Sequence, residues 1–212
     1  MPEKIYFPVL RWKEGEQNAL SQLDDAVKDR IMPIIDFPAD CDFSENRVQN
    51  FCETAAEHWG MNRPFYIDVC TIYCDFTPET DEDQHPVLTL LRDICDAGLE
   101  TIPVIRPDAD DDILAAIHDA LNEGYVENVA LRIIEDEDGQ TPAPEYTRDA
   151  MTSLNLTAEQ VDLILDLQDV NGRIDSQIRD LRSWVTTYGS TFRRSIMVGG
   201  AIPSNLYEHV NE

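Results

Sequence analysis

Lysine is scarce in this chain, and its scarcity excludes some classes of ligand. Only three lysines occur among 212 residues, against thirteen arginines, and the formal net charge is −26. Nucleic acids and anionic membrane surfaces are bound through clustered basic residues, so we expect direct binding to neither. No apolar stretch approaches the ~20 residues that cross a bilayer, and no signal peptide precedes the first apolar run. We therefore expect a cytoplasmic protein.

Cysteine and histidine patterns exclude further classes. The five cysteines are odd in number and form no CxxC pair, and the four histidines do not stand at metal-ligand spacings with them. Free thiols in a reducing compartment are the simplest interpretation, and no zinc site is expected. The chain also lacks a P-loop, an HExxH motif, a Ser-His-Asp order and a Gly-rich phosphate fingerprint after its first apolar run.

What the chain does contain is a series of short apolar runs rich in Val and Ile. Seven of them begin near residues 5, 31, 65, 101, 129, 162 and 195. Runs without polar alternation indicate strands buried on both faces, as in parallel sheets. Segments with helical spacing of apolar residues lie between the runs, at 14–29, 44–59, 85–97, 110–122 and 173–188. This alternation indicates right-handed βαβ units.

The repeat predicts a single α/β domain over residues 1–212 with a TIM-barrel-like (β/α) fold of about seven parallel strands. A complete barrel has eight strands in about 250 residues, and an eighth run at the same spacing would fall beyond residue 212. We therefore expect an incomplete barrel, open between its first and seventh strands. Because an uncovered strand edge pairs readily, a protein partner or a homodimer is expected to cover it.

Most of the apolar runs end in a charged residue, and the carboxyl ends of barrel strands meet at one mouth. The candidate site residues are Arg11, Lys13, Asp36, Asp68, Arg106, Arg132 and Asp166. Their arginines could hold a phosphate-bearing or zwitterionic small molecule, and their aspartates could hold Mg²⁺, with no other cofactor expected. Lys13 is the candidate general base or Schiff-base amine.

A structural role for the same residues is the main alternative. Asp and Arg at neighbouring strand ends could pair with one another as a buried ionic layer that fixes the register of the sheet. The histidines lie outside the strand ends, so the commonest acid/base residue is absent from the predicted pocket. Whether the chain is an enzyme stays open at this point.

Three acidic loops form a second candidate site. They follow the third, fourth and fifth runs, so all three are expected on the rim of the same mouth, where they would attract a basic protein partner. Solvated loops or adaptation to a saline habitat would also account for them. The candidate partner-binding residues are Asp81, Asp83, Asp110, Asp111, Asp112, Glu135 and Asp136.

The opening segment carries a resemblance to a known family. Residues 6–16 spell Tyr-Phe-Pro-Val-Leu-Arg-Trp-Lys-Glu-Gly-Glu, with Ala19 and Leu20 shortly after. This pattern resembles the start of the phage-associated Beta protein family, and segments 31–36, 63–68, 161–166 and 195–203 resemble later parts of it in order. The resemblance implies a barrel-like α/β fold and a setting in phages, prophages or neighbouring defence loci, but no established reaction. Family members are usually longer, so a C-terminal part is expected to be missing here.

Together these observations predict a phage- or prophage-associated interaction protein. It would act as a defence or anti-defence factor through its acidic strand-end face, in the host cytoplasm if a phage encodes it. The alternative is a barrel enzyme, Mg²⁺-dependent or acting on a small molecule, that uses the strand-end Asp and Arg residues.

Overall fold

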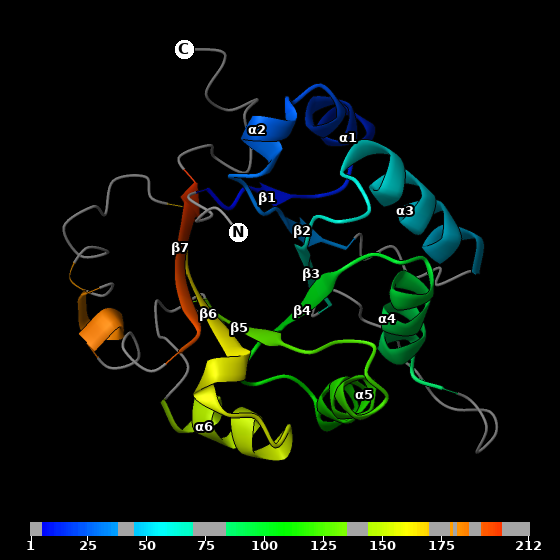
Figure 1. Ribbon diagram of the computed structural model, residues 1–212. Coiled ribbons are helices and arrows are strands. Elements are labelled where there is room, and N and C mark those ends of the chain that lie inside the picture. Colours follow the sequence, from blue (N-terminus) through cyan, green and yellow to red (C-terminus); the bar gives the residue numbers. More distant parts are fainter. Residues whose placement is uncertain are drawn as a thin grey trace, which may run out of the picture.

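The structure, a computed structural model, describes residues 6–37, 45–69, 84–134, 144–169, 179, 182–186 and 192–200. Its strands form one sheet in the order β1-β2-β3-β4-β5-β6-β7, and every neighbouring pair is parallel. The strands are β1 (Val9–Leu10), β2 (Ile34–Asp36), β3 (Phe65–Asp68), β4 (Thr101–Ile105), β5 (Val129–Ile134), β6 (Val161–Asp169) and β7 (Arg194–Gly200). The sheet curls into a nearly closed barrel with helices around its outside (Figure 1). The predicted TIM-barrel-like fold of seven parallel strands is confirmed.

The helices follow the predicted segments with two differences. They are α1 (Glu14–Ser21), α2 (Asp25–Lys28), α3 (Glu45–His58), α4 (Pro86–Asp96), α5 (Asp111–Asn122) and α6 (Pro144–Ser153), with a 3₁₀ turn η1 (Ala158–Gln160). The expected helix 14–29 is divided in two, because Asp24 is extended, with a ψ of 148°, and begins α2. Helix α6 was not predicted. Most of the expected helix 173–188 lies outside the described residues.

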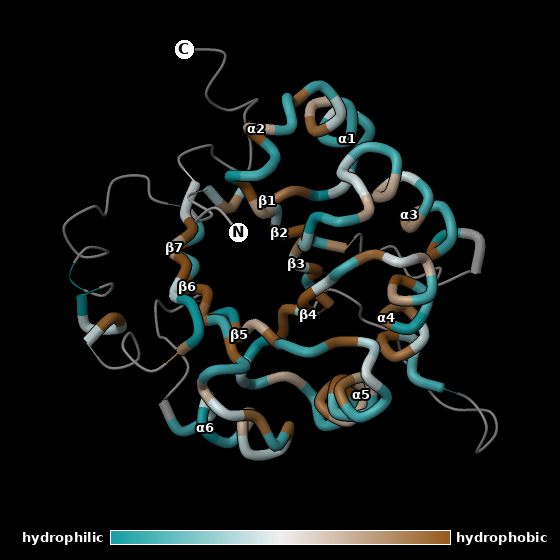
Figure 2. Tube along the Cα trace, in the orientation of Figure 1, coloured by the Kyte–Doolittle hydropathy of each residue, from teal (hydrophilic) through white to brown (hydrophobic). Residues whose placement is uncertain are grey.

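Side chains along each strand point alternately to the two faces of the sheet, and the apolar residues therefore form two cores. The larger core lies between the sheet and the surrounding helices and includes Trp12, Trp59 and Trp184. The smaller core fills the barrel interior with Met32, Ile34, Tyr66, Ile102, Val104, Ala130, Ile164, Ile196 and Val198. Successive strand residues point to opposite faces, so these positions and those two residues away from them face inward. Figure 2 shows apolar residues along the strands and polar ones on many outer helical turns.

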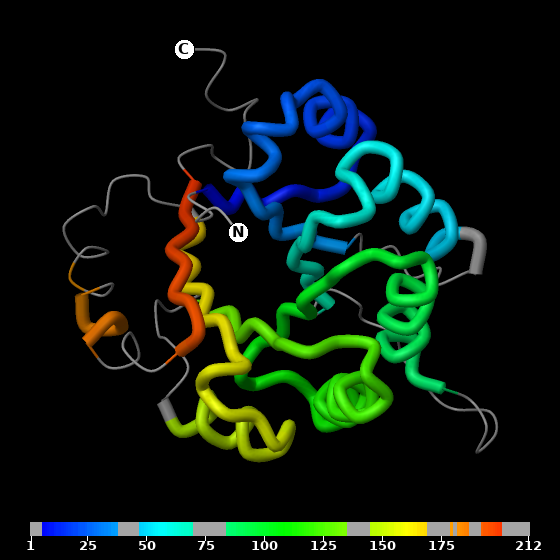
Figure 3. Tube along the Cα trace, viewed as in Figure 1, coloured from blue at the N-terminus to red at the C-terminus, as the bar shows by residue number. Residues whose placement is uncertain are grey.

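The barrel is open at one seam, as predicted. The sheet order begins at β1 and ends at β7, and no pairing joins these two strands within the described residues. Figure 3 shows β1, in blue, and β7, in red, on the two sides of the seam. Among the described residues, no helix is both long and apolar enough to cross a membrane.

Candidate functional site

Four of the predicted strand-end residues meet at the carboxyl-terminal mouth of the barrel. Asp36 and Asp68 close β2 and β3 and are direct partners in the parallel register. Asp166 on β6 stands two residues beyond Ile164, and Arg132 on β5 stands two residues beyond Ala130, so both follow inward-facing core positions. The barrel thus brings together residues that are separated by 34, 64 and 96 positions in the sequence.

Arg132 occupies the centre of this cluster and binds all three aspartates. Its Nη1 donates to Asp36 Oδ1 at 2.9 Å and to Asp68 Oδ2 at 2.5 Å. Its Nε and Nη2 donate to Asp166 Oδ2 at 2.9 and 2.6 Å. We call these four residues the mouth cluster. One guanidinium serves three carboxylates, so the cluster carries a formal charge of −2.

The excess negative charge of the mouth cluster is significant because two of its three carboxylates are buried. The side chains of Asp68 and Asp166 are only 4% and 7% exposed, whereas that of Asp36 is 26% exposed. Burial lowers the pKa of Arg132, but the charges of Asp68, Asp166 and Asp36 outweigh it, and the pKa is raised above its ordinary value. Arg132 therefore stays charged, and the excess negative charge is most accessible to solvent at Asp36.

An irregularity in β6 places a backbone N–H group against the carboxylate of Asp166. The register between β6 and β7 shifts between Asp166 and Asp169, as in a β-bulge. Gln168, which lies in this shift, has a φ of +51°, a conformation uncommon for a residue other than glycine. Its backbone N–H donates to Asp166 Oδ1 at 2.7 Å, while Oδ2 of the same carboxylate accepts from Arg132. Bulges of this kind often re-aim a side chain beside a site.

The other predicted strand-end residues lie outside the mouth cluster. Arg106 directly follows β4, and its Nε and Nη2 bind Asp108 at 3.1 and 3.0 Å in a half-exposed ion pair. Arg11 and Lys13 follow β1 and are exposed. Lys13 is the N-cap of α1, and no hydrogen bond or ion pair joins its amine to the mouth cluster within the described residues.

The residues that carry the N-terminal resemblance form a strained turn after β1. Trp12 has a φ of +53°, which is costly for a bulky side chain. Glu16 accepts hydrogen bonds from the backbone N–H groups of Arg11 and Lys13 at 2.9 and 3.0 Å, and Gln17 donates to the carbonyl of Trp12. The Trp12 indole donates to Thr54 on α3 at 3.1 Å. This segment therefore fixes the passage from β1 to α1.

The predicted acidic rim is described in part. Asp110, Asp111 and Asp112 are exposed at the start of α5, which begins at the same end of the barrel as the mouth cluster. The other four predicted rim residues, Asp81, Asp83, Glu135 and Asp136, lie outside the described residues. His85 is the N-cap of α4 at this end, where its Nδ1 accepts the Val87 N–H at 3.2 Å.

The donor set of the mouth cluster does not resemble a metal site. Within the described part of the chain, no three His, Cys, Asp or Glu residues are arranged to hold a metal ion. The guanidinium of Arg132 binds the three carboxylates that Mg²⁺ would require. A metal ion would have to displace the guanidinium of Arg132 to reach all three carboxylates.

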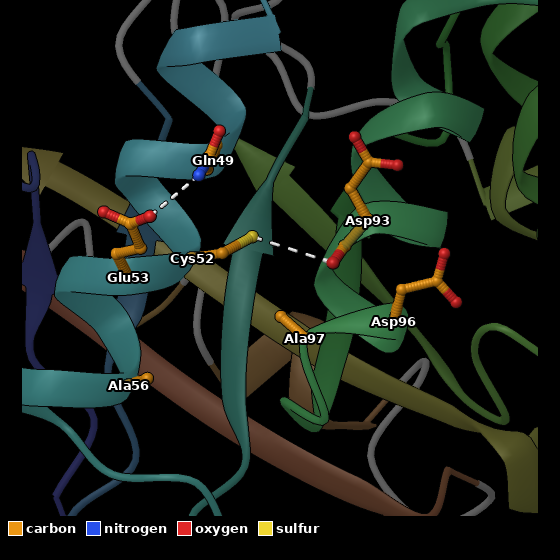
Figure 4. Close-up of a pocket in the computed structure, with 7 residues that line it drawn as sticks. All are labelled: Gln49, Cys52, Glu53, Ala56, Asp93, Asp96 and Ala97. Atoms are coloured by element: carbon orange, nitrogen blue, oxygen red, sulfur yellow. Dashed lines mark hydrogen bonds between the residues drawn. The ribbon is translucent and has the colours of Figure 1, made fainter.

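A separate groove lies on the outer surface between α3 and α4 (Figure 4). It has a volume of about 430 Å³ and is lined by Cys52, Glu53, Asp93 and Asp96 together with Gln49, Ala56 and Ala97. Burial, reinforced by the charge of Asp93, raises the pKa of the Cys52 thiol to about 11. The thiolate is the reactive form of cysteine, so Cys52 is a poor nucleophile.

Sequence reasoning missed a second polar cluster at the other end of the barrel interior. Asp162, the second residue of β6, is fully buried and binds Arg193, Arg194 and the hydroxyl of Tyr66. We call these four residues the lower cluster. Its sequence signal is a charged residue within the apolar run 161–165, two positions before Ile164 and four before Asp166. In a strand buried on both faces, such a residue requires a buried partner.

Comparison with known proteins adds a family assignment. A search of curated proteins finds no match. The family model for Beta protein matches residues 6–212, nearly the whole chain, including the strained turn after β1 and all seven strands. This chain therefore belongs to the Beta protein family, as the resemblance of its opening segment indicated.

Proposed function

We propose that the carboxyl-terminal mouth of the barrel binds a positively charged group on a partner protein. The observation that carries this proposal is that three carboxylates share the one guanidinium of Arg132. The partly exposed carboxylate of Asp36 is where a lysine or arginine side chain can meet the excess charge. Active and binding sites of barrels lie at this end of the strands.

The hydrogen bonds of Arg132 argue against an anionic ligand at the mouth. Four of them go to aspartate oxygens, so the guanidinium has little capacity left to hold a phosphate. A phosphate would also meet the net negative charge of the cluster. The geometry therefore favours recognition of a cation over the phosphate-bearing substrate that the strand-end arginines suggested.

The rim and the overall charge support a protein partner. Asp110, Asp111 and Asp112 add exposed negative charge at the same end of the barrel, and the chain as a whole carries −26. Such a field steers basic proteins toward the mouth and repels nucleic acid. The resemblance to a phage-associated family leads us to place the partner among basic proteins of a phage or its host. The protein would then be a cytoplasmic defence or anti-defence factor.

Binding of a fluorescent lysine-rich peptide, followed by anisotropy, tests this proposal. The triple variant D110N/D111N/D112N should weaken binding by about tenfold or more, and raising the salt from low to physiological concentration should weaken binding to the wild type. A matched triple variant, E57Q/D149N/E159Q, changes the net charge equally at exposed positions away from the mouth. It should bind almost as the wild type does.

Two results would contradict the proposal. Equal losses in both triple variants would show that total charge, not the mouth, attracts the peptide. Unchanged binding in D36N, which removes the accessible charge of the mouth cluster, would show that the barrel mouth takes no part. Circular dichroism of each variant checks that α5, whose first turn contains Asp111 and Asp112, is retained.

A further inference from the structure

A second opening lies at the amino-terminal end of the barrel, where the strands begin. A cavity of about 760 Å³ occupies this end. Its wall combines apolar side chains, including Phe7, Met32 and Ile102, with the guanidinium groups of Arg193 and Arg194. Concave sites of this size are typical of small-molecule binding, and the wall of this one combines polar and apolar side chains.

The lower cluster itself has the opposite charge balance to the mouth cluster, although the exposed side chains of Glu100 and Glu127 also line the cavity. Asp162 is fully buried and binds Arg193 through Nε at 2.9 Å and Nη2 at 2.5 Å. Arg194 Nη1 lies 3.6 Å from the same carboxylate. Two guanidinium groups therefore serve one carboxylate, and the lower cluster carries a formal charge of +1 within a chain of −26. Arg193 neutralises Asp162, which leaves the charge of Arg194 in excess.

Tyr66 holds Arg194 in place. Burial and the charge of Asp162 raise the pKa of the Tyr66 hydroxyl, so this group keeps its proton. The hydroxyl uses that proton to donate a hydrogen bond to Asp162 Oδ2 at 2.5 Å. Its oxygen is then left to accept a hydrogen bond from Arg194 Nη1 at 2.9 Å. Nη1 also contacts Met32 Sδ at 3.6 Å. Within the described residues, no hydrogen bond starts from Nε or Nη2 of Arg194, whose side chain is 38% exposed.

We propose that this cavity binds a monocarboxylate with an apolar body. The free N–H groups of Arg194 would hold the carboxylate, and the side chains of Phe7, Met32 and Ile102 would contact the apolar part. Glu100 and Glu127 also line the cavity and oppose every negative charge that a ligand brings, so the repulsion grows with the charge of the ligand. A single negative charge is therefore favoured over the two that a phosphate monoester carries near neutral pH.

The two ends of the barrel are independent binding regions. Apolar residues of the interior core, among them Ile34, Val104, Ala130 and Ile164, lie between the lower cluster and the mouth cluster. A carboxylate at the amino-terminal end therefore touches none of the residues proposed to bind a basic partner. Failure of either proposal leaves the other intact.

Isothermal titration of the full chain with four small probes tests the inference. The probes are hexanoate, hexyl phosphate, hexylammonium and inorganic phosphate. Hexanoate should bind the wild type, and Arg194→Gln should weaken its affinity by about tenfold or more, because a charge-assisted hydrogen-bonding group is lost. Arg148→Gln removes the same charge from an exposed position on α6 and should leave the affinity unchanged. Arg194→Lys, which keeps the charge without the planar fork, should give an intermediate affinity.

Several outcomes would overturn the inference. One is that hexanoate gives no binding heat with the wild type, and another is that R194Q and the wild type bind hexanoate equally well. A third is that hexylammonium binds the wild type as tightly as hexanoate does; each of these three results contradicts the inference. Tighter binding of hexyl phosphate than of hexanoate would reject the monocarboxylate assignment. Equal binding of inorganic phosphate would reject the role of the apolar wall. Thermal melts of each variant confirm that the titrated protein is folded.

Discussion

Replacing Arg132 with methionine would remove the guanidinium shared by Asp36, Asp68 and Asp166 while retaining much of its apolar volume. Asp68 and Asp166 are almost fully buried, so in the variant two buried carboxylates lose their main counter-charge. Removing one partner from a buried ion pair costs about 3–5 kcal/mol. Because whole domains are stable by only about 5–15 kcal/mol, R132M should be close to unfolding at pH 7.

Urea denaturation followed by circular dichroism measures this loss. Arg106→Met is the matched control, because Arg106 forms a half-exposed ion pair with Asp108 just outside the cluster. Exposed pairs contribute about 0–1 kcal/mol, so the control should lose little stability. A combined variant, R132M with D68N and D166N, should recover part of the loss because the two buried side chains that lost the guanidinium are then uncharged.

The pH dependence of R132M gives a second, independent check. Buried carboxylates without a counter-charge bind protons more readily than the carboxylates of the unfolded chain. The folded variant then holds more protons than its unfolded state, so its stability rises as the pH falls. The difference in unfolding free energy between R132M and the wild type should therefore narrow from pH 7 to pH 5. A loss below about 1 kcal/mol, or a difference that widens at low pH, would refute the buried ionic cluster.

Two further predictions concern other parts of the barrel. Tyr66→Phe removes the hydroxyl that binds Asp162 and positions Arg194, and it should lower the unfolding free energy by about 1–3 kcal/mol in urea denaturation. Tyr146→Phe, at an exposed position on α6, is the control. Equal losses in the two variants would contradict the hydrogen bonds assigned to Tyr66 in the lower cluster. Because the pKa of Cys52 is raised to about 11, this thiol should alkylate with iodoacetamide at pH 8 far more slowly than in the denatured chain, as followed by mass spectrometry. The raised pKa also means that the stability contributed by Cys52 is present below its unfolded value of about 8.5 and is lost as the pH rises toward 11. Rapid labelling of the folded protein would contradict both the burial of Cys52 and its raised pKa.

Much of the architecture followed from local patterns in the sequence. Short runs of Val and Ile without polar alternation marked the strands, and the spacing between runs predicted parallel pairing and an open seam. Asp36, Asp68, Arg132 and Asp166 could be expected at one mouth because parallel strands deliver their carboxyl ends to the same side. Helix α6 was missed, although its apolar stripe is as strong as that of α3, which was predicted.

The contacts within each cluster could not be predicted in the same way. Arg106 and Arg132 follow short apolar runs of neighbouring strands, yet Arg106 forms a half-exposed ion pair with Asp108 while Arg132 binds three buried or partly buried aspartates. Both arginines stand two residues beyond inward-facing core positions, Val104 and Ala130, which are partners in the parallel register. They differ because β4 ends at Ile105, before Arg106, whereas β5 continues past Arg132 to Ile134.

The sequence by itself determined the strand repeat, the parallel sheet and the acidic character of the chain, because these depend on composition and on spacing along the chain. Only the tertiary structure decided that one arginine serves three carboxylates at one end of the barrel, while two arginines serve one buried aspartate at the other. Those charge balances depend on the stagger between distant strands and on the depth of each side chain. Both are set when the sheet closes around its interior core and not by any local segment.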